Sequence, residues 1–143
     1  MKLIDYPPVW LVGALVVAWF WRWPTAWSGS FWPGVLCLAV AAALLIAALR
    51  EFLRARTTIV PRQLPSALVT GGVFRFSRNP IYLADLLVLG GLSLIWGSLP
   101  GLVLVPALGW LLQARFSAGE EARLSEAFGQ QVVAYCSTTR RWL

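Results

Sequence analysis

Four apolar segments, each almost free of charge, limit this chain to a narrow set of folds. They run from about Val9 to Trp23, from Phe31 to Leu49, from Pro80 to Trp96 and from Ser98 to about Ala114. At a rise of about 1.5 Å per residue, helices of these lengths lie near the lower limit for crossing a hydrocarbon core of about 30 Å. The pattern predicts an all-α, polytopic membrane helical bundle with about four transmembrane helices.

The low content of charged residues argues against a soluble fold. Charged residues make up 13 % of the chain and apolar residues 59 %, whereas soluble domains usually carry about 25 % charged residues. The alternative, a soluble protein with an unusually large core, could not cover its surface with so few charges. An early Asp5, the Pro7-Pro8 pair and the lack of a small-residue cleavage site favour a retained first helix over a signal peptide.

The length of 143 residues predicts one membrane domain. The link from Gly97 to Gly101 is too short for anything but a tight antiparallel hairpin of the third and fourth helices. We therefore expect a single domain, 1–143, divided into a pair of N-terminal helices (1–56) and a core (57–143) with helices 80–96 and 98–115 and a cytoplasmic C-terminal helical segment.

The basic residues and the tryptophans predict the same orientation. If both termini and the middle loop are cytoplasmic, all twelve Lys and Arg residues except Arg22 lie inside. Six tryptophans then gather near the outer interface, which indole rings favour: Trp19, Trp21, Trp23, Trp27, Trp32 and Trp96. The polar stretches 50–79 and 115–143 are then cytoplasmic. The preference for Arg over Lys favours a bacterial cytoplasmic (inner) membrane.

The residue inventory excludes several kinds of site. The chain has no histidine, and its two cysteines, Cys37 and Cys136, stand far apart in unrelated surroundings. A disulfide framework, a zinc site and a haem site are therefore not expected, and no metal is predicted. The net charge of +6 does not indicate nucleic-acid binding, because the basic residues border apolar spans instead of interleaving with aromatics on a soluble face.

The start of the third helix carries the first candidate functional residues. Asn79 can cap this helix and Pro80 suits its first turn, and free backbone N–H groups there could also bind an anion. Arg78 flanks this position, where snorkelling to the interface is the simpler role. Asp85 lies about one turn beyond Tyr82 inside the membrane, so it marks either a functional position or an ion pair with an arginine.

The C-terminal segment carries the second group. Ser117 and Glu120 fit a capping box. An apolar stripe follows with spacings of four, four and three, formed by Leu124, Phe128, Val132 and Tyr135. Glu121 falls on the same stripe, and an inward carboxylate needs a partner or a ligand. Gly129 interrupts the stripe, which allows two short helices in place of one.

The order of these two motifs resembles a known enzyme family. The core reads LVTGGVFRFSRNPIYLADLL and, after a hairpin, EEARLSEAFG followed by a tyrosine and TRR. This pattern, from about Thr57 to Arg141, resembles the isoprenylcysteine carboxyl methyltransferases and their phospholipid methyltransferase relatives. Those are integral membrane enzymes that use S-adenosylmethionine. Many of them have His at the position of Asn79 and a second Tyr at that of Val132.

The resemblance implies a cofactor pocket between the start of the third helix and the folded-back C-terminal segment. One wall would comprise Arg78, Asn79, Pro80 and Tyr82, and the other Glu120, Glu121, Tyr135, Arg140 and Arg141. Arginines suit the cofactor's carboxylate, a glutamate its ribose hydroxyls and a tyrosine face its sulfonium. Glu121 or Asp85 could deprotonate an ammonium acceptor. The candidate catalytic residues are thus Glu121, Asp85 and Tyr82.

The implied function is methyl transfer to a lipophilic or small hydrophobic acceptor, either isoprenylcysteine-carboxylate-like or phospholipid-amine-like. The acceptor would enter from the bilayer and the cofactor from the cytoplasm, with membrane lipids as the other partners. Two alternatives stay open: a non-catalytic membrane scaffold or transporter subunit that kept the fold, and a relative of the NADPH-dependent sterol reductases. Ligand binding separates the three: the methyltransferase should bind S-adenosylmethionine, the reductase NADPH, and the scaffold neither.

Overall fold

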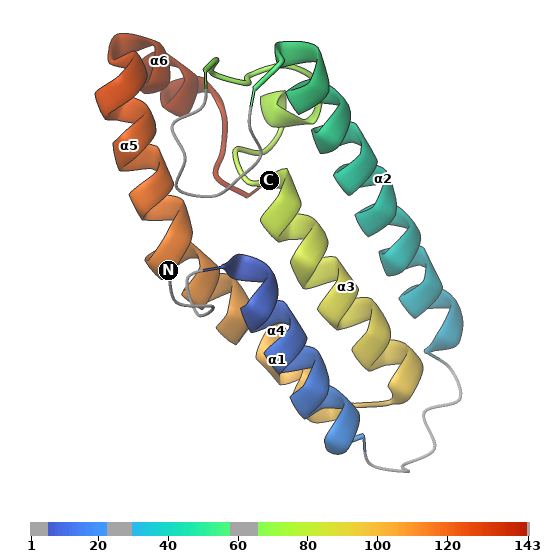
Figure 1. Cartoon of the computed structure of the whole chain (residues 1–143). Coiled ribbons are helices and arrows are strands. Elements are labelled where there is room, and N and C mark those ends of the chain that lie inside the picture. The colour runs from blue at the N-terminus through green and yellow to red at the C-terminus, as the bar shows by residue number, and fades with distance from the viewer. Residues whose placement is uncertain (1–5, 23–29, 58–65, 143) are drawn as a thin grey trace.

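The chain folds into a bundle of helices packed around one central helix (Figure 1). The computed structural model describes residues 6–22, 30–57 and 66–142, and no β-strand forms among them. The elements in chain order are α1 (Pro7–Phe20), α2 (Phe31–Ala55), the 3₁₀ turn η2 (Gly72–Arg75), α3 (Pro80–Trp96), α4 (Leu99–Leu112), the π-helical turn η3 (Gln113–Ser117), α5 (Ala118–Phe128) and α6 (Gln130–Thr138).

Proline and glycine set the boundaries of α3. Pro80 occupies the first helical turn, where the missing N–H costs no hydrogen bond, and Gly97 ends the helix with φ +66°. The predicted range of the third helix is therefore confirmed at both ends. Ser98 starts α4 directly afterwards and accepts a hydrogen bond from the Gly101 N–H, which confirms the tight hairpin. α1 begins at Pro7 and ends at Phe20, so the predicted extension toward Trp23 is wrong, although Trp23 itself lies outside the described residues.

The second helix is longer than predicted. The apolar run stops at Leu49, but α2 continues to Ala55 and ends at Arg56, which adopts a left-handed conformation with φ 50°. The added residues include Glu51 and Arg54, which are strong helix formers and form an ion pair of 2.9 Å. Hydrophobicity therefore marks the part of α2 suited to lipid, whereas helix propensity carries it beyond.

The fourth helix does not stop near Ala114. It passes through η3 into α5 without a break, so Ser117 lies inside a helical run. The predicted capping box is wrong for this reason, since Ser117 makes no capping hydrogen bond to the first turn of α5. Gly129, with φ 53°, separates α5 from α6. The alternative of two short helices is thus confirmed.

α3 is the central helix and packs against α1, α2 and α4. Its contact with α2 depends on glycine, because a Cβ on Gly34 would lie 2.6 Å from the Gly91 carbonyl oxygen. α1 also packs on α4, where Gly101 leaves room for Ala18 and Ser93. The buried core between these helices consists of Ala18, Tyr82, Leu89, Leu108, Leu112 and Phe116.

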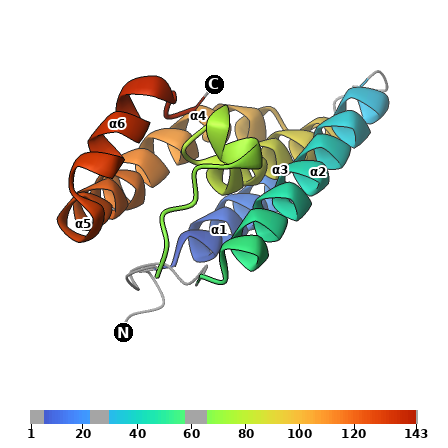
Figure 2. The ribbon, with the colours of Figure 1, turned by 90° about the horizontal axis from the view of Figure 1, so that it is seen from above.

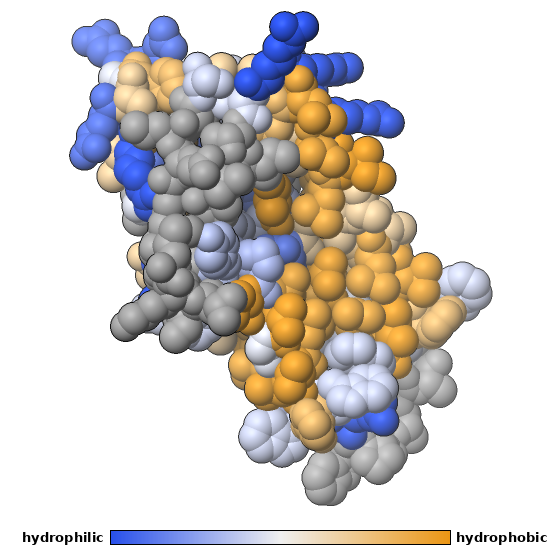
Figure 3. Space-filling model, in the orientation of Figure 1, coloured by the Kyte–Doolittle hydropathy of each residue, from blue (hydrophilic) through white to orange (hydrophobic). Residues whose placement is uncertain are grey.

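Two helical runs, Phe31–Ala55 and Leu99–Phe128, are long and apolar enough to cross a membrane by length and composition, while Pro7–Phe20 and Pro80–Trp96 are shorter apolar helices. Apolar side chains cover much of the visible face along α1 and α2, and the most hydrophilic ones gather at the upper end of the view (Figure 3). These features fit a helical membrane bundle.

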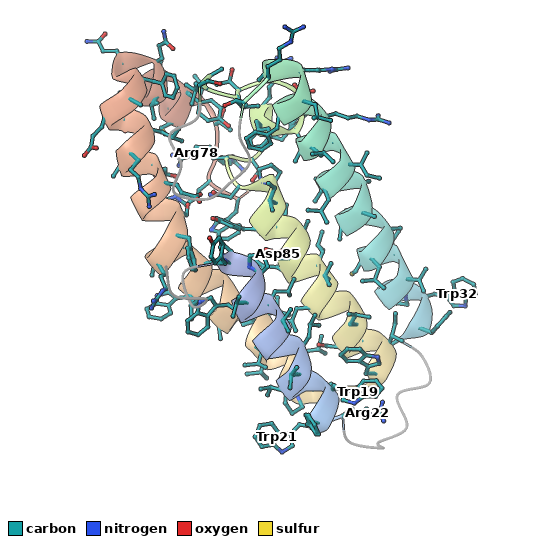
Figure 4. All side chains as sticks on the ribbon, in the orientation of Figure 1. Trp19, Trp21, Arg22, Trp32, Arg78 and Asp85 are labelled. Carbon is teal, nitrogen blue, oxygen red and sulfur yellow. The ribbon has the colours of Figure 1, made fainter. Side chains whose placement is uncertain are left out.

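Aromatic residues mark one end of the bundle. Trp19, Trp21, Arg22 and Trp32 lie at the end far from Arg78 (Figure 4). The rings of Trp19 and Trp96 meet edge to face with centroids 5.1 Å apart, and the Arg22 guanidinium lies 3.4 Å from the Trp19 ring centroid. The predicted gathering is therefore seen for Trp19, Trp21, Trp32 and Trp96, while Trp23 and Trp27 lie outside the described residues.

Candidate functional site at the polar end of the bundle

Polar side chains converge at the end opposite the tryptophans. This polar end consists of η2, α5, α6 and a short segment of residues 139–142, which we call the strap. Seen from this end, η2 lies between α6 on one side and α2 on the other (Figure 2). The start of α3 lies beneath η2 and the strap, so segments from both sequence motifs meet around one helix N-terminus.

An ion-pair cluster connects the two predicted walls. The Glu121 carboxylate accepts hydrogen bonds from Arg141 Nε (3.1 Å) and Arg141 Nη2 (2.7 Å), and its Oε1 lies 3.1 Å from Arg78 Nη1. The bidentate bond raises the pKa of Arg141, so this guanidinium stays charged. The inward carboxylate of Glu121 thus has the partners that its place on the apolar stripe required. Arg78 Nε is buried and has no hydrogen-bond partner among the described residues.

Hydrogen bonds to main-chain carbonyls of the strap attach it to the residues just before α3. The Arg78 N–H donates to the Arg140 carbonyl (3.0 Å), and Ser77 Oγ donates to the Arg141 carbonyl (3.2 Å). The Asn79 amide Nδ2 also donates to this carbonyl (3.3 Å) and to Ser117 Oγ (3.0 Å). Asn79 thus occupies the predicted N-cap position, and its carbonyl accepts from the Leu83 N–H, but its side chain makes no capping bond and its amide donors bind the strap and η3.

Tyr82 and Glu120 form a second contact between the walls. The Tyr82 hydroxyl donates to Glu120 Oε1 at 2.9 Å. Tyr82 is buried in the helical core, one turn into α3, whereas Glu120 is half-buried on α5. The contact therefore places a carboxylate where the apolar core meets the polar end. Arg123 does not bond to Glu120; its Nε donates to the Gly119 carbonyl.

Asp85 lies deeper in the bundle. It is buried on α3, between Arg78 and the tryptophan end (Figure 4). No ion pair joins it to an arginine within residues 6–22, 30–57 and 66–142, so the simple interhelical salt bridge is not seen there. A buried carboxylate of this kind is costly, which makes the position functionally suggestive.

Tyr135 links α6 to η2 beside a cavity. Its hydroxyl donates to the Phe74 carbonyl at 2.6 Å, and burial raises its pKa to about 12, so the phenol stays protonated. The cavity has a volume of about 610 Å³ and is lined by Leu68, Thr70, Arg75, Gln131, Ala134, Tyr135, Thr138 and Thr139. Ligand pockets usually have volumes of roughly 300–1,000 Å³, so this cavity is large enough for a nucleoside.

The structure brings the predicted site residues together around the start of α3, except that Tyr135 lies at η2 and Asp85 deeper in the bundle. Pro80 is buried in the first turn of α3. Arg140 has an exposed side chain, and its main-chain carbonyl accepts the hydrogen bond from the Arg78 N–H. Sequence reasoning missed three residues that hold the strap: Ser77, Gln113 and Trp142, whose indole Nε1 donates to Gln113 Oε1 at 2.9 Å. No local pattern marks them, because each bond joins segments far apart in the chain.

Comparison with known proteins supports one family. Residues 29–131 match the family described as phospholipid methyltransferase, which covers α2 through the first residues of α6. Neither a curated protein nor a solved structure matches the chain. The matched range includes the first motif and the EEARLSEAFG part of the second, and it ends before Tyr135 and the strap.

Proposed function

This chain belongs to the phospholipid methyltransferase family of membrane methyltransferases, and from that premise we propose that it transfers a methyl group from S-adenosylmethionine to a lipophilic acceptor. The observation that carries the proposal is the buried, unpartnered Arg78 Nε beside the Arg78–Glu121–Arg141 cluster. A buried donor without a partner costs free energy unless a ligand or water accepts its hydrogen bond.

The residues present fit the parts of this cofactor. Arg78 and Arg141 can hold its carboxylate, because they offer guanidinium N–H groups beyond those bound by Glu121. Glu120 can accept hydrogen bonds from its ribose hydroxyls while keeping the bond from Tyr82. The cavity beside Tyr135 can receive the rest of a nucleoside. When bound, the cofactor supplies an electrophilic methyl group on a sulfonium.

We place the polar end in the cytoplasm, with both termini on that side, and assign the protein to a bacterial inner membrane. The exposed arginines at the end of α2 and in η2 favour this orientation under the positive-inside rule. The cofactor then enters from the cytoplasm, whereas the acceptor enters sideways from the bilayer toward Tyr82.

The acceptor that fits this site best is an amine. Glu120 and Asp85 lie on either side of Tyr82 along the path from the polar end into the bundle, and neither forms an ion pair among the described residues. Two carboxylates attract an ammonium group and repel a carboxylate acceptor. Asp85 can also take the proton that an ammonium must lose before it can attack, because Glu120 already binds Tyr82 and the ribose. Glu121 is less suited to this task, because two guanidinium groups already bind its oxygens.

The remaining work of these residues is alignment and exclusion of water. Methyl transfer is an in-line displacement that needs the acceptor lone pair, the methyl carbon and the sulfur in one line. Tyr82, buried in the core and fixed by Glu120, supplies a rigid aromatic wall beside that line. The apolar side chains below it exclude water from the acceptor.

Calorimetric titration of S-adenosylhomocysteine into the detergent-purified protein tests the proposal. We expect binding by the parent and a loss of affinity of about tenfold or more in Arg78→Ala, since a charge-assisted contact contributes about 1.5–3 kcal/mol. Arg54→Ala is the matched control, because the Arg54 side chain is 76 % exposed at the end of α2.

The alternatives give different results in the same assay. A folded parent that binds neither S-adenosylhomocysteine nor NADPH would be a scaffold, and one that binds only NADPH would be a reductase relative. If the parent and Arg78→Ala bind S-adenosylhomocysteine equally well, the proposed methyltransferase function stands but the assignment of Arg78 to the cofactor fails. Transfer of label to vesicles that contain an amine phospholipid, and not to a prenylated cysteine carboxylate, then tests the acceptor class.

A further inference from the structure

We propose that the strap is a closing segment of the cofactor site and that Asn79 is the positioning residue that holds it closed. The role in closing on the cofactor rests on the proposed function, whereas the attachment of the strap by Asn79 does not. No regular secondary structure supports the strap, since α6 ends at Thr138. Its place is set by hydrogen bonds to residues 77–79 and η3, by the Arg141–Glu121 ion pair with α5 and by the packing of Trp142 against the core.

The attachment is dense for so short a segment. Three successive residues before α3, numbers 77–79, donate to two successive carbonyls of the strap, those of Arg140 and Arg141. The Arg141 carbonyl accepts from both Ser77 and Asn79, which uses both of its lone pairs. This pairing fixes the main chain at the residue whose guanidinium binds Glu121.

Asn79 is the junction because it has two amide N–H donors. One donates to the strap at Arg141 and the other fits the bond to Ser117 Oγ in the buried π-helical turn η3. The same turn supplies Gln113, which accepts from Trp142 at the far end of the strap. One primary amide thus joins α3, η3 and the strap, and a carboxylate of the same shape could not donate either bond.

Closing would follow from the charges that the strap carries. A short segment held by a few hydrogen bonds, one ion pair and one indole ring opens more readily than the helical core, since it buries little apolar surface. A ligand anion bound by Arg141 stabilises only the closed arrangement, because an open strap removes that guanidinium from Arg78. Ligand binding therefore shifts the strap toward closure.

Limited trypsin digestion with intact-mass detection measures the state of the strap. Trypsin cuts after Arg140 and Arg141, and a docked peptide bond cannot enter the protease cleft. We expect slow cleavage at these bonds in the full-length parent and roughly tenfold faster cleavage in Asn79→Asp, which loses both donors. Gln113→Ala, which frees Trp142, should act in the same direction and is a second variant if Asn79→Asp does not fold. Ser137→Ala is the control, because this exposed hydroxyl bonds to the Ala134 carbonyl within α6 and does not line the cavity.

The same digestion with S-adenosylhomocysteine tests closure. We expect saturating S-adenosylhomocysteine to slow cleavage of the parent. The affinity of Asn79→Asp for this ligand should fall about tenfold. The unfolding transition of this variant, followed by its helical signal, should stay near that of the parent. Cleavage at the parent rate in both variants overturns Asn79 as the anchor. Ligand binding without any change in cleavage overturns closure. If the parent binds no ligand, the proposed function and closure on this cofactor fail, while the cleavage rates still decide whether Asn79 holds the strap.

Discussion

The contact of α2 with α3 and the contact of the strap with α3 are built in opposite ways. Between α2 and α3, Gly34 faces Gly91 so closely that neither position has room for a Cβ. At the start of α3, the strap is held by directional hydrogen bonds from residues 77–79. The hydrophobic effect does not drive helices together in lipid, so close packing must do so, whereas at the water interface polar geometry can select one arrangement.

This difference implies two kinds of sensitivity. The α2–α3 contact should respond to side-chain size and hardly to polarity, and the polar end should respond to the loss of single donors or acceptors. Substitutions that preserve volume but remove hydrogen bonds separate the two regions. So do substitutions that add one methyl group without any polar change.

The largest effect is expected for Gly91→Ala. Its Cβ would lie 2.9 Å from the Gly34 carbonyl oxygen and 3.0 Å from the Cys37 Cβ, so the two helices must separate. We expect a loss of about 3 kcal/mol in the free energy of unfolding, the cost typical of overpacking. Gly90→Ala is the matched control, because its Cβ meets only Val105 Cγ2 at 3.6 Å. Unfolding in detergent followed by circular dichroism measures both, and equal stability of the two variants would refute this account.

Glu121→Ala should have the next largest effect. It leaves the Arg78 and Arg141 guanidinium groups without their shared carboxylate. Because the side chain is 23 % exposed, we expect a loss of about 2 kcal/mol, below the range for fully buried pairs. S-adenosylhomocysteine affinity measured by calorimetry should also fall about tenfold or more. Glu126→Ala, an exposed residue of the same helix, should change neither quantity. Unchanged affinity in Glu121→Ala would remove Glu121 from the proposed pocket.

Parts of this comparison were predictable from sequence and parts were not. Pro80 and Gly97 fixed the ends of α3 because their backbone preferences are local. The inward position of Glu121 followed from the apolar stripe, since helical periodicity is also local. The side chains of Asn79 and Ser117 were expected to cap helices, but they bond to each other instead. Nothing local shows that α4 continues through a π-helical turn into α5, which brings Ser117 to Asn79.

A smaller effect is expected for Tyr82→Phe, which sharpens the boundary between the two regions. The ring keeps its place in the core while the bond to Glu120 Oε1 is lost. We expect a loss of stability of about 1 kcal/mol, the usual value for one hydrogen bond. The methyl-transfer rate should fall by more than S-adenosylhomocysteine affinity, because the wall beside the reacting atoms loosens. Steady-state kinetics and calorimetry measure the two, and a fall in affinity alone would place Tyr82 in ligand binding only.

The smallest effect is expected for Tyr135→Phe and depends on pH. The folded-state pKa of about 12 lies above the ordinary value of 10.0, so the contribution of Tyr135 is complete below pH 10 and is lost as the pH rises toward 12. The variant loses the bond to the Phe74 carbonyl, for which we expect about 0.5 kcal/mol at this half-exposed position. The difference in unfolding free energy between parent and variant should therefore be constant from pH 7 to about 10 and then shrink. A difference that grows above pH 10 would contradict the bond.

Hydrogen bonds at the polar end join residues that are far apart along the chain, and this affects the order in which the protein can assemble. Synthesis proceeds from the N-terminus, and Ser77 leaves the ribosome 64 residues ahead of the Arg141 carbonyl that it binds. By then α1 to α4 can already have entered the bilayer. The nascent bundle must therefore persist through a stage without its polar end, and the glycine contact between α2 and α3 is available throughout that stage. The order of translation thus makes the membrane part a scaffold on which the site is assembled last.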